Sequence, residues 1–254
     1  MVETVLRADH GTVRVLTLNR PAARNALNRD LIRALYAALT DADADAGVGA
    51  VVLTGSDPAF CAGVDLKEAA RDGMKYFAEF TEGSCITAAA EMRTPIIGAV
   101  NGATFTGGLE LALGCDFLIA SERAVFADTH ARVGILPGGG MTARLPHVVG
   151  AAMARRLSMT GEVVDAARAE RIGLVTEVVS HDLLLARAVE LATAITEVPG
   201  PIMLGLKEIY VRGSATVVDP ALAAEGDIAG NQRHDLEGLG ARFDEVSARN
   251  RSQL

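Results

Sequence analysis

Apolar and polar residues alternate along the first 19 positions of the chain. The alternation covers Val2–Ala8 and Thr12–Asn19, and the turn sequence Asp9-His10-Gly11 lies between them. A period of two on both sides of such a turn predicts a β-hairpin. After Arg20-Pro21 the period becomes helical, because leucines recur every four positions behind Asn28, a residue type that caps helices.

Short apolar runs alternate with helical patterns between about residues 45 and 180. The strand candidates are Ala50–Leu53, Ile96–Val100, Phe117–Ala120 and Leu174–Val179. The helix candidates are Ala69–Met92, with a break near Gly83-Ser84, and Asp165–Arg171, which Gly173 stops. Such alternation predicts an α/β fold. The order strand, small-residue turn, helix occurs twice at a spacing of about 46 residues, which favours stacked ββα turns over a doubly wound sheet.

The pattern is helical from Asp182 onward. The candidates are Leu183–Ile195, Pro201–Val211, Ala221–Ala229 and Leu236–Arg249. The sequence Val198-Pro199-Gly200-Pro201 is the best boundary, so we divide the chain into a core of residues 1–197 and a helical module of residues 198–254. A helical module with exposed apolar faces needs a surface to pack on, and we expect that surface to be another subunit.

Composition excludes several classes of protein. The chain has 254 residues, half of them apolar, and a net charge of −8. No cluster of Lys and Arg is interleaved with aromatic residues, so we expect no nucleic acid partner. A polyanionic small molecule stays compatible with this charge, because a few local cations and helix N-termini suffice to bind it.

The cysteines and the apolar runs indicate the compartment and the relation to membranes. Cys61, Cys85 and Cys115 form no CxxC motif, which is typical of reduced thiols in a cytoplasmic protein. The N-terminus lacks the basic-then-apolar order of a signal peptide. The most apolar region, Pro95 to Ala120, is interrupted by polar residues, so we expect a soluble protein with no membrane span.

Two segments carry the strongest chemical signal. Residues 59–68 read AFCAGVDLKE and residues 101–110 read NGATFTGGLE. Each follows an apolar run, turns on small residues and opens into a helical pattern. Such turns leave backbone N–H groups unpaired at a helix N-terminus, where the helix dipole also favours negative charge. Two of them facing each other would form an oxyanion hole, which stabilises an enolate or a tetrahedral oxyanion.

These two segments, with Asn19-Arg20-Pro21 and Arg24-Asn25-Ala26-Leu27, resemble the crotonase (enoyl-CoA hydratase/isomerase) superfamily over nearly the whole chain. The resemblance implies an α/β fold, a crotonase-like spiral of ββα repeats with a helical C-terminal region that builds trimers or dimers of trimers. It also implies an acyl-CoA thioester as substrate, in fatty acid metabolism, and no separate cofactor, because coenzyme A is part of the substrate. No metal-binding cluster is evident in the sequence.

The resemblance assigns catalytic positions. The oxyanion-hole amides would be those of Val64 and Gly107, and Glu110 falls on the first acid/base position of the hydratases. Burial of a Glu side chain within an otherwise apolar run costs free energy, which favours a functional role for Glu110. The second position departs from the family, because His130 stands in the motif Phe126–Gly138 where hydratases have a glutamate. An imidazole can exchange protons near neutral pH, so His130 either replaces that acid or indicates a different reaction; a loop histidine without a catalytic role stays open.

The resemblance also implies positions that bind coenzyme A and the acyl group. Lys67 would lie near the adenine or the phosphates, and Arg24 belongs to a segment whose backbone lines the nucleotide site in relatives. The commonest fate of both residue types is nevertheless the solvated surface. Backbone groups of Ala26, Cys61 and Ala62 would contact the adenine or pantetheine. The remaining substrate-binding candidates are Asp65, Leu66, Gly108, Pro137 and Gly138.

Hydration of a 2-enoyl-CoA to a 3-hydroxyacyl-CoA is the leading interpretation. Double-bond isomerisation, thioester hydrolysis, decarboxylation and dehalogenation stay open, because the acid/base set decides among reactions that share an enolate. A non-catalytic acyl-CoA-binding protein that keeps the oxyanion turns is the alternative of another class. Asp128 matches no acid position of the family and is interpreted only as a turn or capping residue.

Overall fold

Two β-sheets form the centre of the molecule in the computed structural model, which describes residues 3–80, 84–231 and 238–253. The larger sheet has the order β1-β2-β3-β5-β7-β10, with β1 antiparallel to β2 and the other neighbours parallel. Its strands are β1 (Val5–His10), β2 (Val13–Leu18), β3 (Ala50–Gly55), β5 (Ile96–Val100), β7 (Phe117–Ser121) and β10 (Glu177–Val179). The predicted hairpin is therefore present, with its described part running from Val5 to Leu18.

The smaller sheet has the order β4-β6-β8-β9. Its strands are β4 (Ala59–Cys61), β6 (Ala103–Phe105), β8 (Val125–Ala127) and β9 (Val164–Asp165). Each of the first three follows a strand of the larger sheet and precedes a helix: α2 (Leu66–Asp72), α5 (Gly107–Leu113) or α6 (His130–Val133). The chain thus repeats a ββα unit three times, which confirms the predicted spiral.

Local sequence sets the helix starts as expected. Asn28 caps α1 (Arg29–Ala44), since its side chain accepts a hydrogen bond from the amide of Leu31 at 3.0 Å. Asp165 caps α9 (Ala166–Arg171) in the same way, at 2.7 Å from the amide of Arg168. The remaining helices are α3 (Met74–Phe77), α4 (Cys85–Glu91), α7 (Met141–Val149), α8 (Ala151–Thr160), α10 (Leu184–Thr196), α11 (Gly200–Gly230) and α12 (Leu239–Arg251), with short 3-10 turns at Pro21–Ala23, Ala78–Phe80 and His181–Leu183.

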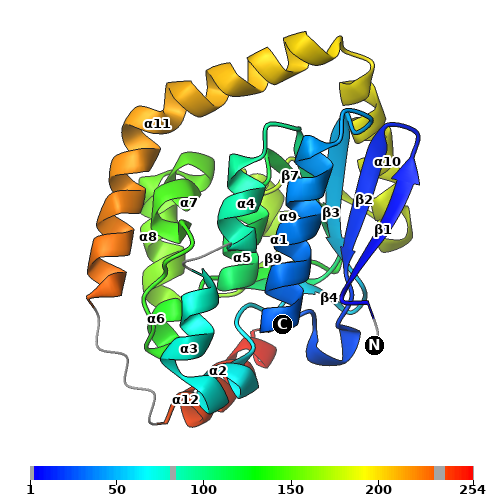
Figure 1. Ribbon diagram of the computed structural model, residues 1–254. Helices are drawn as coiled ribbons and strands as arrows, with labels where there is room; N and C mark the ends of the chain where they lie inside the picture. The colour runs from blue at the N-terminus through cyan, green and yellow to red at the C-terminus, as the bar shows by residue number, and fades with distance from the viewer. Residues whose placement is uncertain (1–2, 81–83, 232–237, 254) are drawn as a thin grey trace.

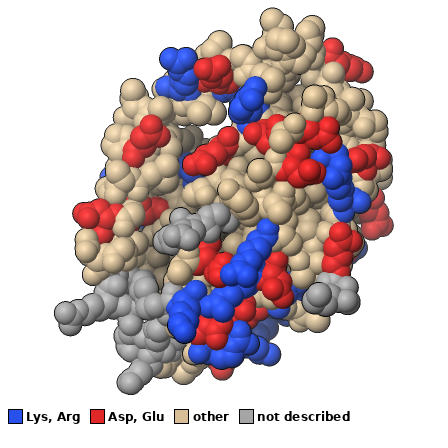
Figure 2. All heavy atoms as spheres, viewed as in Figure 1, with Lys and Arg blue, Asp and Glu red and all other residues tan. Residues whose placement is uncertain are grey.

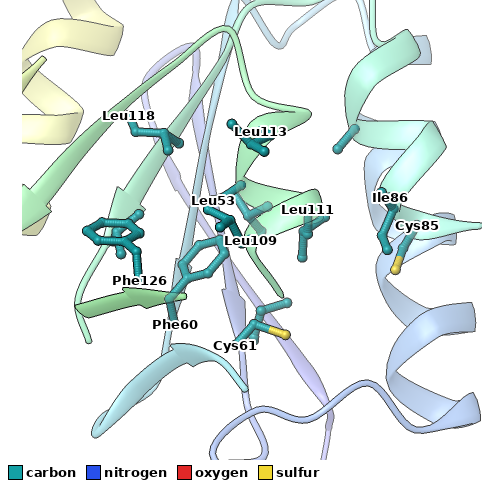
Figure 3. Close-up of a cluster of buried hydrophobic side chains, with 14 of the residues drawn as sticks. Leu53, Phe60, Cys61, Cys85, Ile86, Leu109, Leu111, Leu113, Leu118 and Phe126 are labelled. Atoms are coloured by element: carbon teal, nitrogen blue, oxygen red, sulfur yellow. The ribbon is translucent and has the colours of Figure 1, made fainter. Parts of the chain in front are cut away.

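The core lies on both faces of the larger sheet. Helix α10 covers one face, where its residues Leu184, Ala188 and Ala192 are buried against β2, β3 and β5. The opposite face packs against the smaller sheet and helices α1, α4 and α5. Figure 3 shows Leu109 and Leu111 of α5 near the ring of Phe60 in β4. This packing fixes the position of the N-terminus of α5 relative to the two sheets.

Three segments differ from the sequence-based prediction. The proposed long helix Ala69–Met92 begins earlier and is already broken at Gly73, which has a positive φ of 55°; of the predicted break at Gly83-Ser84, Gly83 lies outside the described residues. The strand predicted at Leu174–Val179 contains only Glu177–Val179, because Leu174 and Val175 form a buried turn.

The C-terminal region differs most. The two helices predicted at Pro201–Val211 and Ala221–Ala229 form one 31-residue helix, α11, which continues through Pro220. Figure 1 shows α11 curving over the top of the molecule and down its side. A proline inside a helix removes one hydrogen bond and bends the helix without always ending it. Helix α12 then packs against α2 and α6; of its predicted start, Leu236 and the next residue lie outside the described part of the chain.

The surface mixes both signs of charge. Figure 2 shows acidic and basic side chains intermingled over one face of the molecule. Among the described residues, no single helix is long and apolar enough to cross a bilayer; residues 181–196 and α11, bent by 105° relative to each other, reach the length and composition of a span only as a pair. All three cysteines are free thiols, as predicted.

Candidate active site

The two small-residue turns meet at Gly63 and Gly107. A Cβ atom built on Gly63 would lie 2.1 Å from the hydroxyl of Thr106, 2.8 Å from the carbonyl of Phe105 and 3.4 Å from the amide nitrogen of Gly107. Gly63 has a φ of 90°, which a side chain would strain, and Thr106 adopts a φ of 48° in spite of its side chain. The turns therefore approach each other as closely as their backbones allow, which requires glycine at position 63.

Val64 and Gly107 border the space between these turns. Residues 63 and 65 both pair with Leu27, on one side of the chain. The N–H of Leu27 donates to the carbonyl of Gly63 at 2.8 Å, and the N–H of Asp65 donates to the carbonyl of Leu27 at 3.3 Å. Alternation along an extended chain then turns the amide of Val64 to the other side. Gly107 opens α5, where an amide has no intrahelical partner. Both residues line the same cavity.

Gly108 sets how closely α5 lies on β4. A Cβ there would be 2.1 Å from the Cys61 carbonyl oxygen, which is backbone and cannot move aside. We expect Gly108→Ala to lower the free energy of unfolding by about 1–3 kcal/mol, the usual cost of overpacking. Thermal or denaturant unfolding measures this loss. Gly205→Ala on α11 is the matched control, because a Cβ there meets nothing within 4 Å; equal stability of both variants would contradict the close approach.

Glu110 lies in the first turn of α5 and is only 3% exposed. Its Oε1 accepts hydrogen bonds from the amides of Gly139 at 2.8 Å and Met141 at 3.2 Å. A Cβ on Gly139 would lie 2.7 Å from Oε2, so glycine at position 139 leaves room for the carboxylate. Burial raises the pKa of Glu110, and the nearby charge of His130 and the two amides oppose that rise. Oε1 is held by the backbone, which leaves Oε2 for chemistry.

His130 opens α6 and is 7% exposed. Its Nδ1 lies 2.7 Å from Oδ1 of Asp128, so Nδ1 carries a proton and donates a hydrogen bond to that carboxylate. The other nitrogen, Nε2, lies 3.7 Å from Oε2 of Glu110. That distance is too long for a direct hydrogen bond, so both atoms stay available to a molecule between them.

The electrostatics of the histidine favour its protonated form. Burial on its own would lower the pKa of His130, but the carboxylates of Glu110 and Asp128 outweigh it, and the net pKa is raised. Burial would likewise raise the pKa of Asp128, but the hydrogen bond and charge of His130 lower it. Both neighbouring carboxyl groups therefore favour the protonated form of His130 in the buried site.

A cavity of about 1360 Å³ connects these groups to the surface. The predicted site residues that line it are Arg24, Ala26, Ala62, Val64, Asp65, Leu66, Lys67, Gly107, Glu110, His130 and Gly138. Three other predicted residues, Cys61, Gly108 and Pro137, do not line it. Cys61 is fully buried in the core, and burial raises the pKa of its thiol to about 12, so it is not a reactive thiolate.

The outer part of the cavity carries exposed cations. Arg24, Lys67 and Arg251 are exposed and line it. The amides of Ala26 and Ala62 are already engaged, with the carbonyls of Ala23 and Arg24, both at 3.0 Å. These two amides are therefore not free to donate hydrogen bonds to a ligand. Asp65 caps α2, and its carboxylate pairs with Arg20 at 2.9 Å. Both residues line the cavity.

Several residues of the site were not predicted from the sequence. Asp128 was interpreted as a turn residue, although its position two residues before His130 is a usable signal. Helix α12 contributes Phe243 and Asn250 to the cavity, and Oδ1 of Asn250 is buried without a hydrogen-bond partner among the described residues. The amides of Gly139 and Met141 leave no trace in the sequence, because any residue but proline supplies an amide.

Known proteins are similar to this chain in sequence and in fold. A family model described as enoyl-CoA hydratase/isomerase matches residues 8–239. A protein of Rhizobium meliloti named "Probable enoyl-CoA hydratase" is 47% identical over 214 residues, 83% of this chain and 82% of its own. The crystal structure of an enoyl-CoA hydratase from Mycobacterium tuberculosis superposes with a TM-score of 0.81 at 47% identity, over 89% of this chain and 97% of that one.

A structure of a monofunctional enoyl-CoA isomerase from M. smegmatis is also similar, with a TM-score of 0.73 and 33% identity over 84% of this chain and 94% of the other. In each of these comparisons the similarity covers most of this chain. With its ββα spiral and its two facing turns, this chain belongs to the enoyl-CoA hydratase/isomerase family, the crotonase superfamily.

Proposed function

We propose that this protein hydrates 2-enoyl-CoA thioesters to 3-hydroxyacyl-CoA. Its family and the names of its relatives support an enzyme of this kind. The observation that carries the proposal is the pair formed by Glu110 Oε2 and His130 Nε2, 3.7 Å apart, beside the turns of Val64 and Gly107. A base, an acid and an oxyanion-stabilising pair of amides are the three parts that the reaction needs.

The proposed steps conserve atoms and protons. Glu110 removes a proton from water as the water oxygen bonds to Cβ, and the C=C electron pair moves towards the thioester carbonyl. The amides of Val64 and Gly107 stabilise the resulting enolate oxygen. The imidazolium of His130 then donates its Nε2 proton to Cα. A proton transfer from Glu110 to His130 restores the starting charges, and Asp128 keeps Nδ1 protonated throughout.

Crotonyl-CoA tests this proposal directly. The purified protein should abolish the absorbance of the conjugated enoyl thioester and form 3-hydroxybutyryl-CoA. If the absorbance persists at high protein concentration while crotonyl-CoA still binds, the hydratase proposal fails for this substrate. Longer acyl chains would then extend the test, since the cavity is lined by apolar groups such as Phe77, Phe80 and Leu136.

Lys67 supports recognition of coenzyme A. It is exposed and lines the cavity. We expect Lys67→Gln to raise KM for crotonyl-CoA by about fivefold, the value of an exposed charge pair, and to leave kcat unchanged. Steady-state kinetics measures both. The truncated thioester of pantetheine, which lacks the nucleotide, should lose nothing, and Lys75→Gln is the matched control because Lys75 is exposed and does not line the cavity.

Isomerisation is the second candidate. His130 replaces one of the two family glutamates, and a monofunctional isomerase is among the similar structures. An isomerase moves a proton from one carbon to another and needs no attacking water. A 3-enoyl-CoA substrate separates the two: formation of the conjugated enoyl thioester as the final product supports the isomerase, whereas onward loss of its absorbance supports the hydratase.

We also propose that the protein is a homo-oligomer. Ile202, Ile209 and Tyr210 of α11 are 64%, 70% and 73% exposed, so residues 198–254 present an apolar face beside the part that lines the cavity. A second copy of the chain would bury this face. Light scattering after size-exclusion chromatography tests this, and a monomer at micromolar concentration would refute it.

A further inference from the structure

Glu225 is a buried carboxylate that the proposed reaction does not use. It lies on α11 and is 7% exposed. One oxygen accepts from the amide of Gly140 at 2.6 Å. The other accepts from the amide of Thr142 at 2.8 Å and from its hydroxyl at 2.5 Å. Three donors on a segment more than 80 residues away thus converge on one side chain.

The amides of residues 139–142 alternate between two carboxylates. Gly139 and Met141 donate to Glu110, whereas Gly140 and Thr142 donate to Glu225. These amides open α7, where no intrahelical partner exists and negative charge is favoured. Because the four donors belong to one short backbone segment, fixing two of them fixes the other two.

Two further contacts support the same segment. Gly140 has a φ of 98°, and Nη1 of Arg144 donates to the carbonyl of Gly139 at 2.7 Å. Leu222, one turn before Glu225 on α11, lies against Gly140. Helix α11 therefore helps to set the position of the 139–142 segment relative to α5.

We propose that Glu225 is a positioning residue: it holds residues 139–142 so that their amides fix Oε1 of Glu110 and leave Oε2 facing His130. This inference rests on the proposed function for its kinetic consequences and on geometry alone for its structural ones. It gives α11 a role in the active site beyond packing and subunit contact.

The charge of Glu225 provides a second signature. The charged groups that act on His130 are Glu110 on α5, Asp128 just before α6 and Glu225 on α11, and Arg144 on α7 lies near the two glutamates. Burial opposes the raised pKa of His130, and Glu225 adds to the effect of Glu110 and Asp128 in raising it. Removal of the Glu225 charge should therefore lower the pKa of His130.

The test compares Glu225→Gln with Asp227→Asn, an equal charge change on the exposed side of the same helix. A Gln amide would place an N–H group against the N–H of Gly140 or Thr142, so the segment must shift. We expect kcat for crotonyl-CoA to fall about 10- to 100-fold, the size of a small misplacement of a catalytic group. KM should stay within about twofold, since the substrate contacts stay. Asp227→Asn should match the wild type.

A readout that needs no turnover separates this inference from the proposed function. NMR titration of the His130 imidazole should show a lower pKa in Glu225→Gln than in the wild type, and no change in Asp227→Asn. Loss of a purely structural contact would lower thermal stability without this shift. If the wild type does not hydrate crotonyl-CoA, the proposed function fails and the titration still decides the inference.

Thr142→Val covers the case in which Glu225→Gln does not fold. It removes one hydrogen bond to Glu225 and no charge, so kcat should fall about threefold to tenfold with the pKa of His130 unchanged. Wild-type kcat in Thr142→Val would then overturn the inference. Where Glu225→Gln folds, wild-type values of both kcat and the His130 titration would overturn it.

Discussion

Replacement of Glu110 by Gln should lower kcat for hydration of crotonyl-CoA by about 10²- to 10⁴-fold, the usual contribution of a general base. The amide side chain keeps the shape of the carboxylate and can still accept from the amides of Gly139 and Met141 through its oxygen. It cannot remove a proton from water. Steady-state kinetics and calorimetric binding of an acyl-CoA together measure the effect, because the Kd should stay at the wild-type value.

Glu91→Gln serves as the control for this variant, since Glu91 is an exposed carboxylate on the neighbouring helix α4. It should retain full activity. A Glu110→Gln protein with more than about one-tenth of the wild-type kcat would remove Glu110 from the role of base. Wild-type protein without turnover, together with acyl-CoA binding in both forms, would indicate an acyl-CoA-binding protein.

Replacement of His130 by Gln should lower kcat by about 10²-fold or more and remove the alkaline limb of the pH–rate profile. The proposed reaction needs Glu110 ionised and His130 protonated. Activity should therefore be lost as the pH falls through the raised pKa of Glu110, and lost again as the pH rises through the raised pKa of His130. Both limbs should lie above the ordinary ranges of a free carboxyl and a free imidazole.

His147→Gln is the matched control, because His147 is exposed on α7 and does not line the cavity. It should leave both limbs in place. Wild-type activity in His130→Gln would make His130 a bystander. A strong gain of activity in His130→Glu would show that the natural residue is not tuned for hydration and would favour a different reaction of the same enolate.

Much of the fold could be predicted because its signals are long or chemically specific. The β1–β2 hairpin, the capped helices α1 and α9, and strand β5 follow from period, turn residues and caps. The strands of the smaller sheet have two or three residues each and carry no measurable period. Helices α7 and α8 were missed, since Pro146 and Gly150 interrupt their pattern.

Part of the site could also be predicted, because its motifs are local in the sequence. The motifs around Gly63 and Gly107 mark a local backbone geometry, and the structure brings those turns together with Glu110 and His130. Contacts between distant segments leave no local pattern. Asp128 could be read from its spacing to His130, but Glu225 reaches Gly140 across 85 positions, and only the course of α11 reveals it.

One measurement tests the central claim most directly: incubation of crotonyl-CoA with the wild-type protein in heavy-oxygen water, followed by mass spectrometry of the thioester. The account predicts 3-hydroxybutyryl-CoA with one labelled oxygen in its hydroxyl group, and far slower labelling with either Glu110→Gln or His130→Gln. Unlabelled crotonyl-CoA recovered intact, or labelling at the same rate in all three proteins, would contradict catalysis by the Glu110–His130 pair.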